Sequence, residues 1–312
     1  MRPRGRRQGP LHSARGCQGP RREPHRTPEG RCTWPLDGLN DGRRPLRWPD
    51  SWPKGRRAQG LGHGRRDRNR PDNRAPHGQV EPEVRSRQGV PEGLLERLEK
   101  VQLVLASRAV LEDGFEEPIE LVAGIDVAFR GDVAYGACVL LSYPDLRVLE
   151  VSISEVEVRL PYVPGFLAFR EVPAMLKALR GLGQRPDVVL VDAQGVAHPR
   201  RCGEATHLGV VAGVPTVGVA KRRLYGRYWP EPKWPDTWTL LRDEKGPLGF
   251  VYLSKARCRP IIISPGHMVS FSSALEIVRS CIRGHKLPEP TRLAHLKASE
   301  AARNVKSGGT PS

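Results

Sequence analysis

Three carboxylates stand out in this sequence because each lies at the edge of a segment that should form part of a core. Asp126 interrupts the apolar run of residues 121–129, Asp192 follows the strand-like residues 188–191, and Glu171 lies in a segment with helical spacing. A buried carboxylate is costly unless it is paired, hydrogen-bonded, bound to a metal or protonated. Acids that converge on one point therefore predict a hard divalent cation, and the alternative for each is a surface carboxylate or a helix cap.

Two further side chains could take part in the same chemistry. Lys221 follows the apolar residues 215–220, so its ammonium should emerge at the strand-end face that carries the acids, where it can hold a phosphate or polarise a water. The alternative is a solvated lysine beside Arg222 and Arg223. His267 follows a Pro-Gly pair just before an expected helix, where its ring can reach a metal or a phosphate near a helix N-terminus.

The elements that must position these residues begin near residue 91, where the sequence acquires the patterning of a globular α/β domain. Leucine and valine at helical spacing predict a helix over residues 91–108. Three strand-like runs with short, turn-rich links then predict an antiparallel meander. These runs are residues 119–129, 133–141 and 148–158.

The second half alternates helices and strands, which is typical of parallel crossover units packed beside a meander. The expected elements are a helix over 167–182, a strand over 188–191, a helix over 204–211 and a strand over 216–219. Strands over 238–242, 250–253 and 261–263 and a closing helix over 271–282 follow. This order is that of the ribonuclease H-like fold, so we predict an α/β domain with a mixed sheet flanked by helices.

Positive charge is concentrated in the first 90 residues, which hold 22 Lys or Arg against 9 Asp or Glu and so contribute +13 of the net +17. The segment is rich in Gly and Pro and lacks apolar periodicity, so we predict a disordered basic tail. One interpretation is an arm that binds a phosphate backbone through counterion release. The other is a start codon assigned too early in a GC-rich reading frame, since no methionine lies between Met1 and Met175.

The spacing of the cysteines and the lack of a secretory signal favour a cytoplasmic protein. Outside the tail the cysteines are spread singly, without a CxxC pair, at Cys138, Cys202, Cys258 and Cys281. This spacing argues against a structural zinc site and against a disulfide framework. No apolar segment typical of a secretory signal follows the basic N-terminus, and no stretch is long enough to span a membrane.

Several separated motifs resemble the endonuclease V (deoxyinosine 3′ endonuclease) family over residues 91–284. The matching blocks are Gly124-Ile125-Asp126, Pro161-Tyr162-Val163-Pro164-Gly165, Phe169-Arg170-Glu171, Asp192-Ala193-Gln194-Gly195, Ala197-His198-Pro199-Arg200, Gly218-Val219-Ala220-Lys221 and Ser264-Pro265-Gly266-His267. Each block alone is a weak signal. Their joint occurrence, in this order and across the globular part of the chain, is specific.

The resemblance implies roles for the residues of these blocks. Asp126, Glu171 and Asp192 would be ligands of Mg²⁺, or of Mn²⁺, with Lys221 and His267 completing the catalytic set. Phosphodiester hydrolysis needs an activated water and neutralised phosphate charge, which paired metals roughly 3.5–4 Å apart can supply.

The resemblance also implies a substrate-binding surface. The loop of residues 161–164 would act as a wedge in the base stack. Its prolines, which include Pro164, would stiffen the loop, and Tyr162 would supply a flat ring. The base pocket would be lined by Gly165, Leu167, Gly195 and Leu224. His198, in the loop after Asp192, could contact phosphate or the extruded nucleotide, and Arg200 could hold the phosphate backbone; the alternative for His198 is a satisfied loop histidine. Ala193 replaces the glycine common in the family, and its methyl group could narrow the approach of the base.

The implied function is a metal-dependent repair nuclease that nicks DNA at the second phosphodiester bond 3′ to deoxyinosine and leaves 3′-hydroxyl and 5′-phosphate ends. It would act on DNA as a monomer and would not associate with a membrane. The alternatives are an inosine-specific endoribonuclease, acting on inosine-containing RNA, and a nucleic-acid binder without catalysis. The expected organisation is a basic tail (1–90), a nuclease domain (91–284) and a C-terminal tail (285–312), helical at most over 291–303 and without an assigned function.

Overall fold

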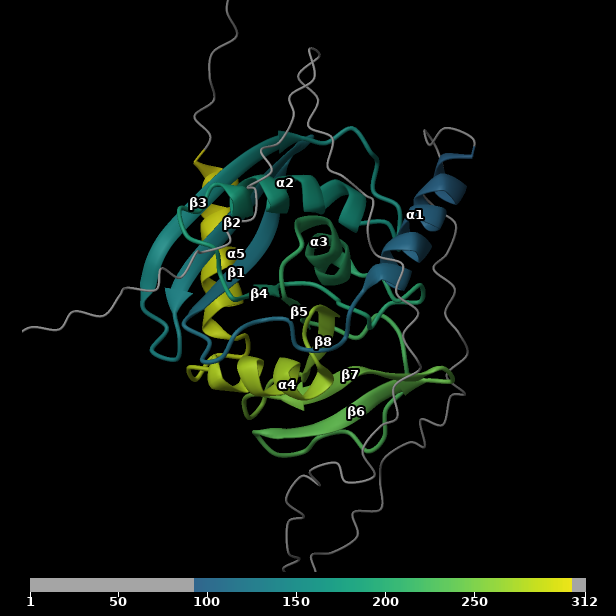
Figure 1. Cartoon of the computed structure of the whole chain (residues 1–312), viewed down its shortest axis with the longest axis vertical. Coiled ribbons are helices and arrows are strands. Elements are labelled where there is room, and N and C mark those ends of the chain that lie inside the picture. Colours follow the sequence, from purple (N-terminus) through teal and green to yellow (C-terminus); the bar gives the residue numbers. More distant parts are fainter. Residues whose placement is uncertain (1–92, 305–312) are drawn as a thin grey trace, which may run out of the picture. The chain divides into compact units, whose positions relative to one another are not determined.

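The structure is a computed structural model that describes residues 93–304 of the 312-residue chain. The predictions for the basic tail, residues 1–90, lie outside the described residues. Within residues 93–304, eight strands form one mixed sheet in the order β3-β2-β1-β4-β5-β8-β7-β6. Figure 1 shows this sheet with helices packed along it.

The predicted meander forms one side of the sheet. Strand β1 (Leu121–Arg130) pairs antiparallel with β2 (Val133–Ser142), which pairs antiparallel with β3 (Val148–Glu157). The β1–β2 link is a tight turn in which Gly131 takes a φ of 58°, a left-handed conformation that glycine adopts without the usual steric cost.

The predicted crossover units place two parallel strands beside β1. Helix α2 (Ala168–Arg180) leads to β4 (Val188–Val191), and helix α3 (Glu204–Ala212) leads to β5 (Thr216–Ala220). Strand β4 pairs parallel with both β1 and β5. All residues of β4 and β5 are buried, which explains why both strands appear in the sequence as continuous apolar runs.

Three antiparallel strands complete the sheet, and the last of them is longer than the sequence predicts. Strands β6 (Thr237–Asp243), β7 (Gly246–Leu253) and β8 (Ile261–His267) follow in the chain, and helix α4 (Phe271–Ser280) packs on β8. The expected Pro-Gly turn is part of β8, because a register shift beside Val217 accommodates Pro265 and an extra residue. The mixed sheet flanked by helices is confirmed.

Helix α5 (Glu289–Arg303) packs on β1 and β2, although the sequence analysis placed these residues in a tail. A Cβ at Gly124 would lie 2.0 Å from the Pro290 backbone, so only glycine lets α5 approach β1 this closely. Gly136 of β2 instead faces the Ala174 carbonyl of α2. Alternate residues of a strand face opposite sides, so α2 and α5 cover opposite faces of the meander (Figure 1).

Helix α1 (Leu94–Arg108) packs against α3. Its side chain Gln102 is only 1% exposed, an unusual degree of burial for a glutamine. Among the described residues, no helix is both long enough and apolar enough to cross a membrane.

Candidate active site

Asp126 and Asp192 come together because of the parallel pairing of β1 and β4. Ile125 pairs with Val191, so the two aspartates occupy the next position on neighbouring strands. The backbone N–H of Asp192 donates to the Ile125 carbonyl over 3.1 Å, which continues the strand pairing to this point. Both carboxylates are largely withdrawn from solvent, with side-chain exposures of 11% for Asp126 and 2% for Asp192.

A cationic and an imidazole side chain face these carboxylates. Lys221 directly follows β5, and its Nζ lies 2.6 Å from Asp192 Oδ2. This contact is an ion pair without good hydrogen-bond direction, because Asp192 Oδ2 has no hydrogen-bond partner among the described residues. His295 Nδ1, on α5, lies 2.7 Å from Asp126 Oδ2. Potential ligand atoms of Asp126, Asp192 and His295 all lie within 4.8 Å of one another.

Two glutamates extend the acidic cluster from the first turns of neighbouring helices. Glu171 lies in the first turn of α2, and Glu204 is the first residue of α3. Their side chains share a hydrogen bond, in which a protonated Glu204 donates to Glu171. This bond partly offsets the upward shift that burial gives the pKa of Glu171 and adds to the upward shift of the pKa of Glu204. Glu204 was not predicted from the sequence, because an acid at the start of a helix is usually an exposed partner of the helix dipole.

Burial sets the ionisation of this cluster. Desolvation, followed by repulsion from Asp192, raises the pKa of Asp126 to about 6. Desolvation raises the pKa of Glu171 to about 7, with Asp126 and Asp192 adding repulsion. The pKa of the buried Glu204 is raised well above its ordinary value, first by desolvation and then by repulsion from Glu171, Asp126 and Asp192. Water alone compensates these carboxylates poorly, and an oxygen-rich cluster of this kind fits a hard divalent cation.

His267 does not join the cluster. It pairs with Thr216 at the start of β5, whereas Lys221 follows the end of that strand. The backbone N–H of Val110 donates to His267 Nδ1 over 3.2 Å, and burial lowers the pKa of the ring. The expectation that His267 supports the metal site therefore has no geometric basis. The reason is the length of β8, which carries His267 to the start of β5, away from the strand ends that hold the aspartates.

The histidine that does reach the carboxylates, His295, comes from the segment to which the sequence analysis gave no function. A usable signal was present. Small or short side chains recur at helical spacing at Thr291, Ala294, Ala298 and Ala302, all of which are buried. This stripe predicts a helix that packs closely on another element, and His295 borders it.

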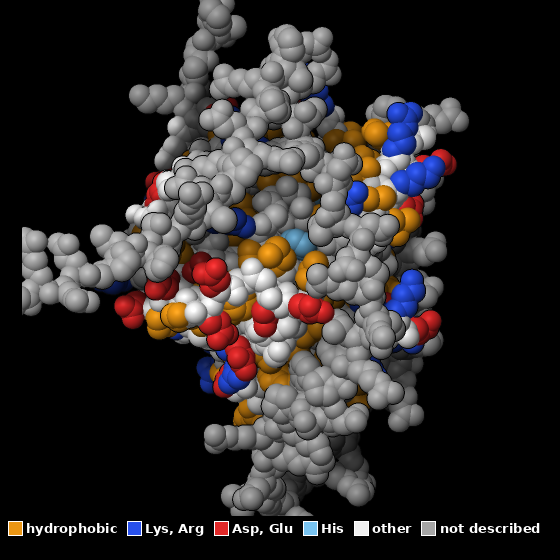
Figure 2. Space-filling model, viewed as in Figure 1, with side chains coloured by type: hydrophobic (Ala, Val, Ile, Leu, Met, Phe, Trp, Pro, Cys, Tyr) orange, Lys and Arg blue, Asp and Glu red, His pale blue; other side chains and the backbone are white. Residues whose placement is uncertain are grey.

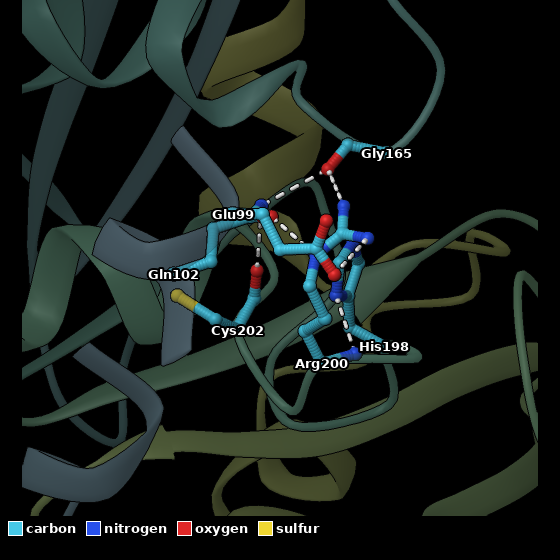
Figure 3. Close-up of polar contacts among 6 residues, drawn as sticks. All are labelled: Glu99, Gln102, Gly165, His198, Arg200 and Cys202. Atoms are coloured by element: carbon cyan, nitrogen blue, oxygen red, sulfur yellow. Dashed lines mark hydrogen bonds and ion pairs between the residues drawn. The ribbon is translucent and has the colours of Figure 1, made fainter. Parts of the chain in front are cut away.

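The loop of residues 161–165, which the resemblance predicts to act as a wedge and which we call the wedge loop, is tied to the body of the protein by Gln102 (Figure 3). The amide nitrogen of Gln102 donates to the Gly165 carbonyl over 2.9 Å and approaches the Cys202 carbonyl at 3.4 Å. Its amide oxygen accepts from Arg200 Nε over 2.6 Å. Arg200 also donates to the Gly165 carbonyl over 3.0 Å. We call Gln102, Gly165, Arg200 and Cys202 the clasp.

Arg200 therefore bonds to groups inside the protein and does not extend outward to contact a phosphate backbone. Besides its clasp contacts, its guanidinium lies 4.6 Å from the centre of the Phe166 ring and 3.9 Å from Glu99. His198 is also buried, and its Nδ1 accepts from the backbone N–H of Arg200 over 3.2 Å. Burial and the charge of Arg200 lower the pKa of His198 to about 4, so the ring is neutral near pH 7. His198 matches the satisfied loop histidine of the sequence alternatives.

The remaining predicted substrate residues divide into exposed and packed groups. Tyr162 and Leu224 are 54% and 55% exposed, as a base-contacting surface requires. Gly195 is packed, since a Cβ there would lie 2.2 Å from the Pro265 carbonyl oxygen. Leu167, which immediately precedes α2, and Pro164, in the wedge loop, are half-buried and lie between these two groups in exposure.

Ala193 does not stand as an obstacle to a base in this structure. It is 9% exposed and belongs to the hydrophobic core cluster that contains Val172 and Ala205. Its methyl group therefore packs within the protein, which differs from the expectation of a narrowed approach.

Comparison with known proteins places this architecture in a family. The endonuclease V family model matches residues 104–296. Endonuclease V from Streptomyces avermitilis is 35% identical, with a TM-score of 0.62 over 66% of this chain and 92% of that one. The catalytic domain of human endonuclease V is 33% identical, with a TM-score of 0.64 over 69% and 98%.

A third similar structure contains nucleic acid. Endonuclease V from Ciona intestinalis, in complex with a 23mer DNA containing an inosine followed by a ribo-adenosine, is 27% identical, with a TM-score of 0.61. The match covers 70% of this chain and 100% of that one. On the extent of the family match and the identity to these structures, the chain belongs to the endonuclease V family of nucleases.

Proposed function

We propose that the protein is a metal-dependent DNA repair endonuclease that nicks a strand at the second phosphodiester bond 3′ to deoxyinosine, leaving 3′-hydroxyl and 5′-phosphate ends. The observation that carries this proposal is the convergence of Asp126, Glu171 and Asp192 with Lys221 at one edge of the sheet. The presence of inosine in the DNA bound by the Ciona relative supports the choice of lesion.

Asp126, Glu171 and Asp192 would hold Mg²⁺ or Mn²⁺. A divalent cation at this position would supply an activated water and neutralise charge on the phosphate. Lys221 is 43% exposed while it contacts Asp192, so its ammonium can also hold a phosphate oxygen. We assign to His295 the supporting role that the sequence analysis gave to His267, because its contact fixes the orientation of Asp126.

Tyr162 would act as the wedge that separates the lesion from its neighbours. Its ring is half exposed, while the carbonyl of Gly165 at the end of the same loop is held by Gln102 and Arg200. An exposed ring on an anchored loop loses little conformational freedom when it enters a base stack. Inosine pairs poorly, so unstacking at the lesion costs less than at a normal base pair. All the proposed groups come from one chain, which favours action as a monomer.

The test is strand nicking by the full chain with Mg²⁺ on matched duplexes that carry deoxyinosine, deoxyadenosine or a single ribo-inosine, with Asp126→Ala as the control. We expect a nick on the 3′ side of deoxyinosine only, lost in the variant and after chelation of the metal. Binding without a nick would instead indicate a non-catalytic nucleic-acid binder.

A second candidate function is inosine-specific cleavage of RNA. The observation in its favour is the ribo-adenosine that follows inosine in the nucleic acid bound by the Ciona relative. In the same assay, cleavage confined to the ribo-inosine substrate would replace the DNA repair proposal with this function.

A further inference from the structure

A cationic cavity of about 700 Å³ adjoins the acidic cluster. Its lining includes Cys258 and Leu287 but no acidic residue, and its basic residues are Lys221, Arg222, Arg259, His285, Lys286 and Arg292. Such a density of positive side chains is unexpected from the net charge, because residues 91–312 contain 29 Lys or Arg against 25 Asp or Glu.

The cavity is a local feature of the charge distribution. On the face shown in Figure 2, acidic side chains gather in one region, while Lys and Arg side chains are scattered. A concentration of cations in one hollow therefore indicates a specific anionic ligand more than a generally basic surface.

Two residues that line the cavity, Lys221 and Arg292, connect it to Asp192 and Asp126. Lys221 contributes to the lining and also forms the ion pair with Asp192, while Lys286 Nζ donates to the Lys221 carbonyl over 3.3 Å. On α5, Arg292 lies one turn before His295, which contacts Asp126. An anion in the cavity would consequently lie next to a phosphate held at the carboxylates.

Several of these cations lack a carboxylate partner. Arg292 is paired with Glu289 at 2.5 Å, and Lys221 with Asp192 at 2.6 Å. Among residues 93–304, no ion pair satisfies Arg222, Arg259 or Lys286. Desolvation lowers the pKa of Lys286, Cys258 raises it in part, and the charges of Lys221, Arg222 and Arg259 lower it. The cavity thus holds surplus positive charge before any ligand binds.

We propose that this cavity binds a phosphate of the substrate strand that flanks the scissile phosphate. A guanidinium can bind phosphate oxygens through two parallel hydrogen bonds, and contacts of this type position a strand without reading its sequence. The inference rests on the proposed function and deepens it, since it adds a second phosphate site to the one at the metal cluster.

The test measures binding in the absence of divalent metal, so that cleavage plays no part. Binding of the full chain to an inosine-containing duplex is followed by fluorescence anisotropy over a series of KCl concentrations. The variant is Arg259→Gln, chosen because Arg259 is exposed and its loss leaves the core intact. The matched control is Arg180→Gln, which removes an exposed arginine at the end of α2, on the other face of the meander.

We expect Arg259→Gln to weaken binding about 3- to 10-fold at low salt and to reduce the slope of log K against log salt by about 0.9, the value for one lost phosphate contact. Arg180→Gln should retain the wild-type slope. An unchanged slope in Arg259→Gln would overturn the proposal, as would a slope that falls equally in both variants.

A second measurement identifies the phosphate. Neutral methylphosphonate linkages are placed one at a time beside the scissile position, and each duplex is tested with wild type and Arg259→Gln. At one position the two changes should be non-additive, because they remove the same contact. Additivity at every position, with inorganic phosphate stabilising wild type but not the variant, would mean that the cavity takes a free anion and not the strand.

These results are separable from a failure of the proposed function. If wild type does not distinguish inosine or does not cut in Mg²⁺, the proposed function fails whatever the salt slopes are. If wild type cuts beside inosine and the Arg259→Gln slope is unchanged, only the cavity assignment fails.

Discussion

In the acidic cluster around Asp126 and Asp192, the buried carboxylates outnumber the cations that face them. In the clasp, by contrast, both the oxygen and the nitrogen of the Gln102 amide form hydrogen bonds with protein groups. In the acidic cluster, burial and mutual repulsion raise the pKa of Asp126 and Glu171. In the clasp, neutral amide and carbonyl groups share the charge of Arg200. The cluster is therefore completed by protons or a cation, while the clasp is complete within the protein and presets the wedge loop.

The largest effect should come from breaking the acidic cluster. Asp126→Asn removes one charge but preserves size, and we expect metal-dependent nicking to fall on the order of 10³-fold, equivalent to several kcal/mol of lost transition-state stabilisation. Thermal unfolding without metal should change little, because repulsion is relieved at the same time. Nicking by the variant at near the wild-type rate would remove Asp126 from the site.

Two histidines differ in their distance from the acidic cluster, since His295 contacts Asp126 whereas His267 pairs with Thr216 at the start of β5. His295→Ala should lower nicking by about 10- to 100-fold, the range for a residue that orients a metal ligand. His267→Gln should leave the rate within a few-fold of wild type once both proteins are shown to be folded. The assay is single-turnover nicking over a range of Mn²⁺ concentrations, and a larger loss in His267→Gln would contradict the structural placement.

Breaking the clasp should affect stability and lesion discrimination but not metal binding. Gln102→Leu leaves Arg200 and the Gly165 carbonyl with fewer partners, which should lower the free energy of unfolding by about 1–3 kcal/mol. Nicking at deoxyinosine relative to deoxyadenosine should also fall. Leu103→Ala, an exposed neighbour on α1, is the control. Unchanged stability and discrimination in Gln102→Leu would show that the clasp does not position the loop.

The pH dependence of stability without metal should report the raised pKa values of the acidic cluster. The folded-state pKa values of about 6 for Asp126 and about 7 for Glu171 exceed the ordinary values of 3.8 and 4.5, so the folded protein binds more protons across this interval. Stability should therefore fall as pH rises from about 5 to 7.5 and recover with Mn²⁺ at the upper end. Calorimetric melting temperatures check this, and Glu171→Gln should flatten the dependence.

The part of the site that could be predicted from sequence lies where apolar strands end in polar residues. Asp126, Asp192 and Lys221 interrupt or follow buried runs, so their convergence follows from the parallel strands that carry them. The order of helices and strands could also be predicted, because the periodicity of apolar residues changes clearly between elements.

The rest depends on pairings that are distant in sequence. His295 contacts Asp126 only because α5 returns across β1, where Gly124 permits the close approach. His267 was misplaced because Pro265 and Gly266 normally indicate a turn, whereas an irregular pairing keeps them within β8. Arg200 was expected to contact phosphate because nothing in its neighbourhood of the sequence reveals its partner Gln102, which lies on α1.

Binding of Mn²⁺ to the full chain at pH 7.5, followed by the loss of the free-ion electron paramagnetic resonance signal, shows whether the acidic cluster is the metal site. We expect wild type and His267→Gln to bind Mn²⁺ alike and Asp126→Asn to bind it at least about tenfold more weakly. Equal binding by all three proteins, or tighter binding by Asp126→Asn, would contradict the assignment of the acidic cluster as the metal site.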